Sequence, residues 1–236
     1  MARTDPGPTR RRRGHPVTIH VIAPGDRPAR AAILLFHGGG WVQGSPEQFF
    51  PQCRAMAQRG ILAASGVYRL VGGGADSPAD CLADARAAIS EFQGIAASHG
   101  LGEVAVGGGS AGGQLALAAT LIDPVGPAPS RLVLFNPVVD LCCGFDAGLL
   151  ALVGLTPRQA AALSPAHHAQ SGLPPTLIFH GTADRLAPIS AVRDLCTATG
   201  ARLVEFEGAE HGFFNVSPYY EQTLDRMAAF LLGPGE

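Results

Sequence analysis

The sequence contains no lysine, so all 17 of its basic residues are arginine. Aspartate and glutamate together number 19, and the formal net charge of −2 gives no electrostatic reason to expect a nucleic acid as partner. The largest local charge is the run Arg10 to Arg13 near the amino terminus. Such a run is typical of a solvated segment, and we predict a flexible basic arm over residues 1–15.

Long apolar segments are also missing. No apolar run approaches the ~20 residues that a membrane-spanning helix needs. The arginine run could suggest a twin-arginine export signal, but the apolar segment behind it, Val17 to Ile22, is short and is interrupted by His20. We therefore expect a cytoplasmic protein that has no signal peptide and does not contact a membrane.

The cysteine pattern argues against a disulfide framework. The five cysteines are an odd number and lack the spacing of metal ligands, and such frameworks are typical of much smaller secreted domains. His167 and His168 are adjacent, which does not place two ligands on one helix face. We predict neither a metal nor a cofactor.

Apolar residues make up 47% of the 236 residues, enough for one sizeable core, and we predict a single domain over residues 16–236. Alternation of apolar and polar residues predicts a strand with one solvated face at 17–22, and apolar runs predict strands at 33–36, 61–67, 104–106, 132–135, 177–179 and 203–206. Helical patterns occupy 46–59, 78–92, 111–121 and 188–199. This alternation predicts an α/β fold whose mainly parallel sheet is covered by helices on both faces. The long gap from Asn136 to Pro175 is expected to hold a small excursion.

Five glycines surround one serine in GGGSAGG, residues 107–113, between an expected strand and an expected helix. Gly107, Gly109 and Gly112 match G-x-G-x-x-G, which binds a dinucleotide pyrophosphate. The same stretch also matches G-x-S-x-G around Ser110, the turn that presents a nucleophilic serine. A dinucleotide site needs an acidic residue after the next strand, but Asn136 and Pro137 stand there. We therefore favour the nucleophile.

A serine nucleophile requires donors for the developing oxyanion earlier in the chain, and then an acid and a histidine later. The glycines of His37-Gly38-Gly39-Gly40 follow an expected strand and can bring backbone N–H groups close to an acyl oxygen. The N–H of Ala111 would add a further donor. Asp184 and His211 each follow a later strand. In this scheme His211 removes the proton of Ser110, and Asp184 holds the ring in the required tautomer.

Other residues compete for these roles. Asp140, Glu207 and Glu210 also lie near expected strand ends, but Asp184 follows the penultimate strand, where the acid is expected. His37 is expected to brace its loop rather than transfer protons. Two aromatic residues, Trp41 and Phe213, are candidates for substrate binding, with packing in the core or at the rim as the alternative.

Together, HGGGW, GGSAGG, HGTAD and EHGFF resemble the α/β-hydrolase superfamily, in its hormone-sensitive-lipase-like carboxylesterase branch. Longer stretches, LVLFNPVVD among them, are similar to bacterial acetyl-esterases of the acetylxylan and feruloyl esterase type. The resemblance covers about residues 17 to 232. It implies a catalytic triad of Ser110, Asp184 and His211, and an oxyanion hole formed by Gly39, Gly40 and Ala111.

The sequence departs from that branch in two respects. Larger members place a helical lid before the first strands, whereas 32 residues precede Ile33 here, so we expect a minimal lid and an open site. Relatives that act on plant polysaccharide are usually exported, whereas this chain shows no signal peptide.

These patterns predict a serine esterase that cleaves small-molecule esters with short acyl groups, including acetylated carbohydrates or phenolic esters. An amidase or peptidase would use the same triad, and a hydrolase-fold protein without activity could bind a small ligand in the same pocket. The acyl length, the alcohol and the existence of a homo-oligomer stay open.

Overall fold

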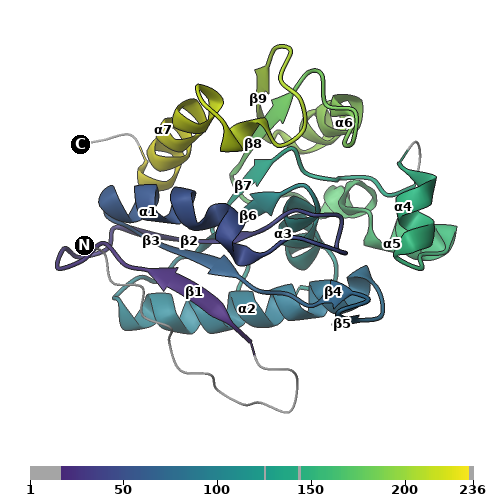
Figure 1. The fold of residues 1–236 in the computed structure, drawn as a ribbon. Coiled ribbons are helices and arrows are strands. Elements are labelled where there is room, and N and C mark those ends of the chain that lie inside the picture. The colour runs from purple at the N-terminus through teal and green to yellow at the C-terminus, as the bar shows by residue number, and fades with distance from the viewer. Residues whose placement is uncertain (1–16, 125, 143–144, 234–236) are drawn as a thin grey trace.

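The computed structural model describes residues 17–124, 126–142 and 145–233, so the expected basic arm lies outside the described residues. Seven strands form one sheet in the order β1-β3-β2-β6-β7-β8-β9 (Figure 1). They are β1 (Ile19–Ile22), β2 (Ala31–Phe36), β3 (Ile61–Gly66), β6 (Ala105–Gly109), β7 (Arg131–Phe135), β8 (Thr176–Gly181) and β9 (Arg202–Phe206). Every neighbouring pair is parallel except β1 with β3, which confirms the mainly parallel sheet.

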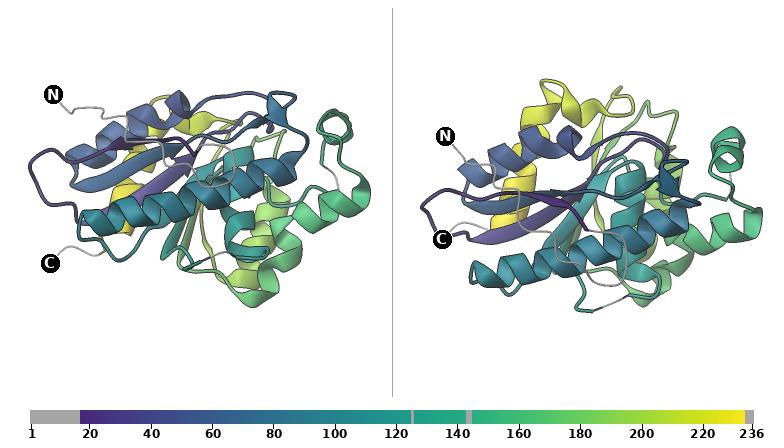
Figure 2. Two further views of the ribbon diagram at one scale, coloured as in Figure 1. Left: turned by 90° about the horizontal axis from the view of Figure 1, so that it is seen from below. Right: turned by 60° about the horizontal axis from the view of Figure 1, so that its bottom comes forward.

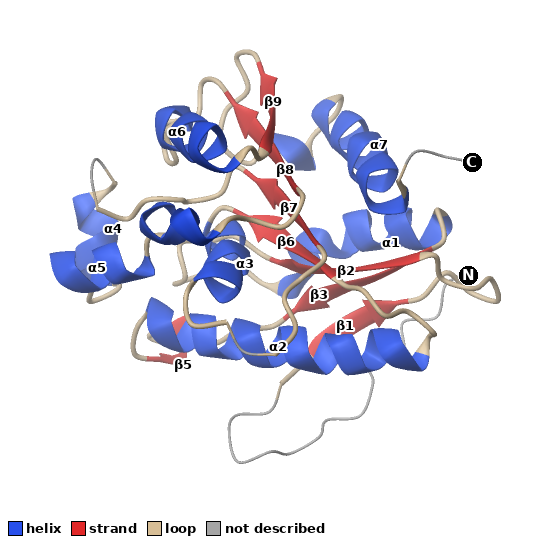
Figure 3. Ribbon diagram, turned by 180° about the vertical axis from the view of Figure 1, so that it is seen from behind, coloured by secondary structure: helices blue, strands red, loops and turns tan. Residues whose placement is uncertain are grey.

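Helices cover both faces of this sheet because its strands bury side chains on both sides. Along β2, Ile33 and Leu35 pack on one face with α1 (Phe50–Gln58) and α7 (Tyr219–Leu232). Leu34 and Phe36 point to the other face, against the helices α2 (Pro78–Ser98), α3 (Ala111–Leu121) and α6 (Ile189–Thr199). Figure 2 shows α2 on the side of the sheet opposite α1, and Figure 3 looks onto the α2, α3 and α6 face.

Most expected helices are present with small differences in extent. The pattern at 46–59 forms a short 3₁₀ turn, Pro46–Phe49, before α1, and α2 continues beyond the expected end to Ser98. The entry of α2 is stabilised by a capping box, in which Ser77 and Asp80 satisfy each other's free backbone N–H groups. Helix α7 was not predicted, although Leu224, Met227 and Leu231 have the spacing of a buried helix face.

The segment between β7 and β8 forms the expected excursion. It contains α4 (Ala147–Leu152), α5 (Pro157–Leu163) and a 3₁₀ helix over Pro165–Ser171, and α4 and α5 stand away from the sheet (Figure 1). A two-stranded ribbon of β4 (Leu70–Val71) and β5 (Gly74–Ala75) lies between β3 and α2 in the chain. Within the described residues, no helix is both long enough and apolar enough to cross a bilayer.

Candidate active site

Ser110 lies at the turn between β6 and α3, in a backbone conformation that residues other than glycine rarely adopt. Its φ of 53° and ψ of −118° are strained for a residue other than glycine. Three backbone hydrogen bonds hold this conformation: the N–H of Ser110 donates to Phe135, and its carbonyl accepts from Gln114 and Val138. The hydroxyl makes no helix-capping bond and is directed elsewhere, so Ser110 is not an ordinary helix N-cap.

Close packing of backbone against backbone explains Gly112, two residues after the serine. A Cβ on Gly112 would collide with the carbonyl oxygens of Phe36 and His37 at the end of β2. Only glycine permits this approach, which places the loop after β2 against the turn that carries Ser110. The ideal Cβ of Gly38 would in turn lie 3.2 Å from the Cβ of Ser110.

The structure brings Ser110, His211 and Asp184 into one hydrogen-bonded chain. The Nε2 atom of His211 lies 3.0 Å from the Oγ of Ser110, and its Nδ1 lies 2.7 Å from the Oδ2 of Asp184. These residues are far apart in the sequence but follow β6, β9 and β8, whose carboxyl ends share one edge of the sheet. The order serine, base and orienting carboxylate is the geometry required for an activated nucleophile.

The carboxylate of Asp184 is fully buried and fully hydrogen-bonded. Its Oδ1 accepts from the backbone N–H groups of Leu186 and Ala187, each at 2.9 Å, while Oδ2 accepts from His211. Burial alone would raise the pKa of Asp184, but the bonds from His211 and Ala187 hold that pKa below its usual range. Asp184 is therefore ionised at neutral pH and presents a carboxylate acceptor to Nδ1 of His211.

A second histidine lies behind Asp184. His180 has no exposed surface, donates from Nε2 to the carbonyl of Ala187 at 2.8 Å, and has the same atom 3.5 Å from the Oδ2 of Asp184. Burial lowers the pKa of His180, so that the ring is neutral beside the carboxylate.

The rival acids do not contact His211. Asp140 accepts hydrogen bonds from the backbone of Cys142 and the hydroxyl of Ser164, and it lies 3.7 Å from Nε2 of His167. Glu207 and Glu210 are exposed. Ligand atoms of Asp140, Cys142 and His167 lie within 4.8 Å of one another, a spacing that a metal could use, but the bonds to Asp140 already account for its position as an anchor of the excursion.

The loop after β2 carries Gly39 and Gly40, two of the three expected oxyanion donors, and Ala111 begins α3. Within the described residues, the backbone N–H groups of Gly39, Gly40 and Ala111 have no protein acceptor, so they are free to bind an oxyanion. At a φ of 115°, Gly39 has a conformation that favours glycine, and its carbonyl accepts from the N–H groups of Val42 and Gln43.

Side chains beneath this loop brace it. The ring of His37 is buried and stacked on Tyr68, with ring centroids 4.2 Å apart, and the Tyr68 hydroxyl donates to the His37 carbonyl at 2.9 Å. Burial lowers the pKa of His37, which is therefore neutral and suited to bracing. The ribbon adds a further tie, since the N–H of Val71 donates to the carbonyl of Trp41.

The two candidates for substrate binding lie in the core. Trp41 has no exposed surface, and its indole N–H donates to the Oε1 of Gln114 at 3.1 Å. Phe213 is 3% exposed and packs edge-on against Phe214 and Tyr219. These contacts support the packing alternative for both residues, because neither ring offers a surface to a ligand.

Sequence reasoning assigned no role to two residues that the structure places at the site, Asn136 and Gln114. Asn136, buried at the end of β7, reaches both His211 and Gly212. Gln114, one helical turn beyond Ser110, joins Trp41 to the carbonyl of Leu163. The only sequence signal that could have indicated a role for Gln114 is its position as a polar residue inside an apolar helix pattern.

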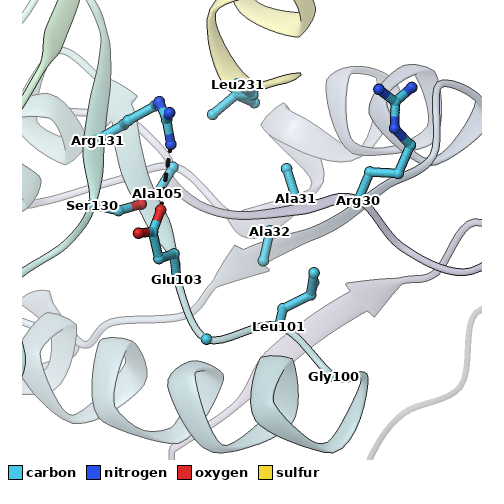
Figure 4. Close-up of a pocket in the computed structure, with 11 residues that line it drawn as sticks. Arg30, Ala31, Ala32, Gly100, Leu101, Glu103, Ala105, Ser130, Arg131 and Leu231 are labelled. Atoms are coloured by element: carbon cyan, nitrogen blue, oxygen red, sulfur yellow. Dashed lines mark ion pairs between the residues drawn. The ribbon is translucent and has the colours of Figure 1, made fainter. Parts of the chain in front are cut away.

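A separate hollow of about 210 Å³ lies at the opposite edge of the sheet, where β2, β6 and β7 begin. Arg131 points toward Glu103 at its mouth, with nitrogen and oxygen 3.6 Å apart, and Ala31, Ala105 and Leu231 line it (Figure 4). No nucleophile paired with a base lines this hollow. Ser110, Asp184 and His211 lie at the other, carboxyl edge of the sheet.

Comparisons with known proteins agree with this geometry. Residues 33–147 match the family model described as alpha/beta hydrolase fold. The chain is 29% identical to an acetyl-hydrolase of Streptomyces hygroscopicus, over 92% of this chain and 82% of that protein. It is 31% identical to a triacylglycerol lipase of Mycobacterium tuberculosis, over 70% of this chain, but the match spans only 37% of that longer protein.

Solved structures of esterase 2 of Thermogutta terrifontis are similar along the whole chain. With the form phosphoramylated by tabun, the TM-score is 0.83 and the identity 35%, covering 100% of this chain and 97% of the other. With the propionate-bound form, the TM-score is 0.83 and the identity 34%, covering 100% and 96%.

The fold and the comparisons define a carboxylic ester hydrolase. The chain belongs to the α/β-hydrolase family, in its hormone-sensitive-lipase-like carboxylesterase branch.

Replacing Asp184 with asparagine should preserve the fold but remove most activity. The amide oxygen can still accept from Leu186 and Ala187, while the amide nitrogen faces Nδ1 of His211 and favours the wrong ring tautomer. We expect kcat to fall by roughly 10³ to 10⁴-fold on a chromogenic acetyl ester, with little change in melting temperature. Asp140→Asn is the matched control and should retain most activity; comparable losses in both variants would contradict the assignment.

Replacing Gly112 with alanine should prevent the close approach at the turn. The new Cβ would meet two backbone carbonyls that cannot move without disrupting β2. We expect a loss of at least about 3 kcal/mol in the free energy of unfolding, or insoluble protein. Gly94→Ala, on open surface of α2, should instead be neutral or stabilise by up to about 1 kcal/mol. Chemical denaturation of both variants measures the difference.

Proposed function

We propose that the protein hydrolyses carboxylic esters with short acyl groups, acetyl esters among them, through an acyl-enzyme formed on Ser110. The observation that carries this proposal is the hydrogen-bonded chain from Ser110 through His211 to Asp184, opposite free N–H groups of the loop after β2. No cofactor or metal is required by this arrangement.

In the proposed first half-reaction, the Oγ of Ser110 attacks the acyl carbon while its proton passes to Nε2 of His211. The carbonyl oxygen takes up the electron pair, and the N–H groups of Gly39, Gly40 and Ala111 bind the resulting oxyanion. The electron pair then returns from the oxyanion, the bond between the acyl carbon and the alcohol oxygen breaks, and Nε2–H protonates the departing alcohol, which leaves the acyl group on Ser110. In the second half-reaction a water molecule gives its proton to Nε2, attacks the acyl group and releases the acid, which restores the Ser110 hydroxyl.

The preference for short acyl groups rests on the position of Leu149 in α4. An ideal Cβ on Gly40 would lie 3.3 Å from a terminal methyl of Leu149, so this side chain already fills the space beside an oxyanion donor. The acetyl-hydrolase relative and the propionate-bound esterase structure are consistent with small acyl groups in similar sites. Acetylated carbohydrates and phenolic acetates are the substrate classes that we propose first.

Replacing Ser110 with alanine tests the nucleophile. We expect kcat on a chromogenic acetyl ester to fall by roughly 10⁴-fold or more. Without the Ser110 hydroxyl no acyl-enzyme can form, and only direct attack by water remains. A fluorophosphonate should label the wild-type protein at Ser110 and leave the variant unlabelled, as read by mass spectrometry. Full activity of the variant would refute the mechanism, and absence of labelling in the wild type would favour a ligand-binding protein. A matched amide substrate, expected to react far more slowly, separates the amidase alternative.

Shortening Leu149 to alanine tests the acyl-length limit. The lost methyl groups should enlarge the space beside Gly40, and the ratio of kcat/KM for octanoate to that for acetate should rise roughly tenfold. Leu152→Ala is the control, because Leu152 lies on the same helix but is 64% exposed. An unchanged ratio in Leu149→Ala would show that another residue sets the acyl length.

A further inference from the structure

Asn136 is held rigidly beside the catalytic histidine. It follows β7, has no exposed surface, and has a positive φ of 36°, a conformation that asparagine tolerates better than most residues. Its backbone N–H donates to the carbonyl of Phe179 on β8 at 2.8 Å. The side chain therefore projects from a fixed point of the sheet edge.

The side-chain amide of Asn136 contacts two successive residues of the loop after β9. Its Oδ1 accepts from the backbone N–H of Gly212 at 3.3 Å, and its Nδ2 lies 3.3 Å from Nε2 of His211. A backbone N–H can only donate, so the amide oxygen must face Gly212. The NH₂ group is then left facing the ring, where it can only donate to His211.

A neutral imidazole has one protonated and one unprotonated ring nitrogen, and its hydrogen-bond partners determine which nitrogen carries the proton. The Asp184 carboxylate accepts from Nδ1, and the amide of Asn136 donates to Nε2. Both neighbours favour the same tautomer, with the proton on Nδ1 and the lone pair on Nε2. That lone pair is the one that must receive the proton of Ser110.

We infer that Asn136 is a positioning residue that, opposite Asp184, keeps Nε2 of the resting His211 free of a proton. The inference rests on the proposed function of His211 as the base. When the Oγ–H bond of Ser110 breaks and an Nε2–H bond forms, the new N–H faces an amide that offers no acceptor. The proton is therefore passed to the leaving alcohol rather than held by the protein.

Other ionisable groups face His211 from neighbouring elements. Asp184 contacts it from the loop after β8, and His180 on β8, neutral because burial lowers its pKa, lies behind Asp184. Glu210 precedes it in the same loop and is exposed. Substitutions at Asn136 leave all three unchanged, so a change in the acid limb of the pH profile reports on the amide.

The test compares Asn136→Asp with Asn136→Gly in pH profiles of kcat/KM on an acetyl ester. Aspartate has the same shape and can still accept from Gly212, but it places an acceptor beside Nε2 and favours a proton there. We expect the pH of half-maximal activity on the acid limb to rise by about one unit, and kcat/KM at neutral pH to fall by roughly 100-fold. Glycine accommodates the positive φ and removes both contacts, so we expect a smaller shift and a loss of roughly tenfold.

Asn215→Asp is the matched control. Asn215 is exposed and donates to the carbonyl of Gly212 at 3.2 Å, so the change adds the same charge and alters the same loop without touching the ring. We expect less than a third of the shift seen in Asn136→Asp. Equal shifts of the acid limb in Asn136→Asp and Asn215→Asp would overturn the inference. So would pH profiles of the Asn136 variants that differ from the wild-type profile only by a constant factor.

Ring ¹⁵N NMR of resting protein provides a readout that does not need turnover. We expect the wild type to carry the His211 proton on Nδ1, and Asn136→Asp to carry one on Nε2. An unchanged tautomer in Asn136→Asp would overturn the inference. A wild type that hydrolyses no ester would instead refute the proposed function, and the two failures are thereby distinguishable.

Discussion

The site depends on one contact in which two stretches of backbone meet without side chains between them. The end of β2 and the first turn of α3 approach so closely that a Cβ on Gly112 would collide with carbonyl oxygens of Phe36 and His37. This contact sets the distance between the nucleophile turn and the loop that carries the oxyanion donors. Three backbone hydrogen bonds then hold Ser110 in its strained conformation. Packing around the sheet edge, rather than the serine itself, therefore stabilises the reactive geometry.

Much of this arrangement could be predicted because it follows from local patterns. Apolar runs identified six strands of the main sheet, since strands buried on both faces leave little polar alternation, and the alternation of Val17 to Ile22 identified β1. Ser110, Asp184 and His211 each lie in the connection that follows a strand, and parallel strands bring their carboxyl ends to one edge. The order of the motifs along the chain therefore indicated which residues meet in space, although the individual distances required the structure.

Other features could not be predicted, because they depend on contacts between distant residues. Asn136 was noted only as the wrong residue for a dinucleotide site, and nothing in the sequence shows that its amide lies beside His211. Trp41 stands in a glycine-rich loop that suggests exposure. Its indole is nevertheless fully buried in the core, where its N–H is hydrogen-bonded to Gln114. Helix α7 carried a recognisable apolar spacing, but its beginning at Tyr219 has no side-chain cap to mark it.

The two hydrogen bonds of Gln114 have a consequence for how such a site can change. One joins it to the indole beneath the oxyanion loop, and the other to Leu163 at the end of α5. The excursion that carries Leu149 is thus linked by hydrogen bonds to the loop that holds Gly39 and Gly40, the proposed oxyanion donors. Under the proposed function, insertions in the excursion that preserve this link would alter selectivity without displacing the loop after β2. Insertions that displace Leu163 would disturb selectivity and reactivity together. Fewer insertions are therefore expected to change the substrate without loss of activity.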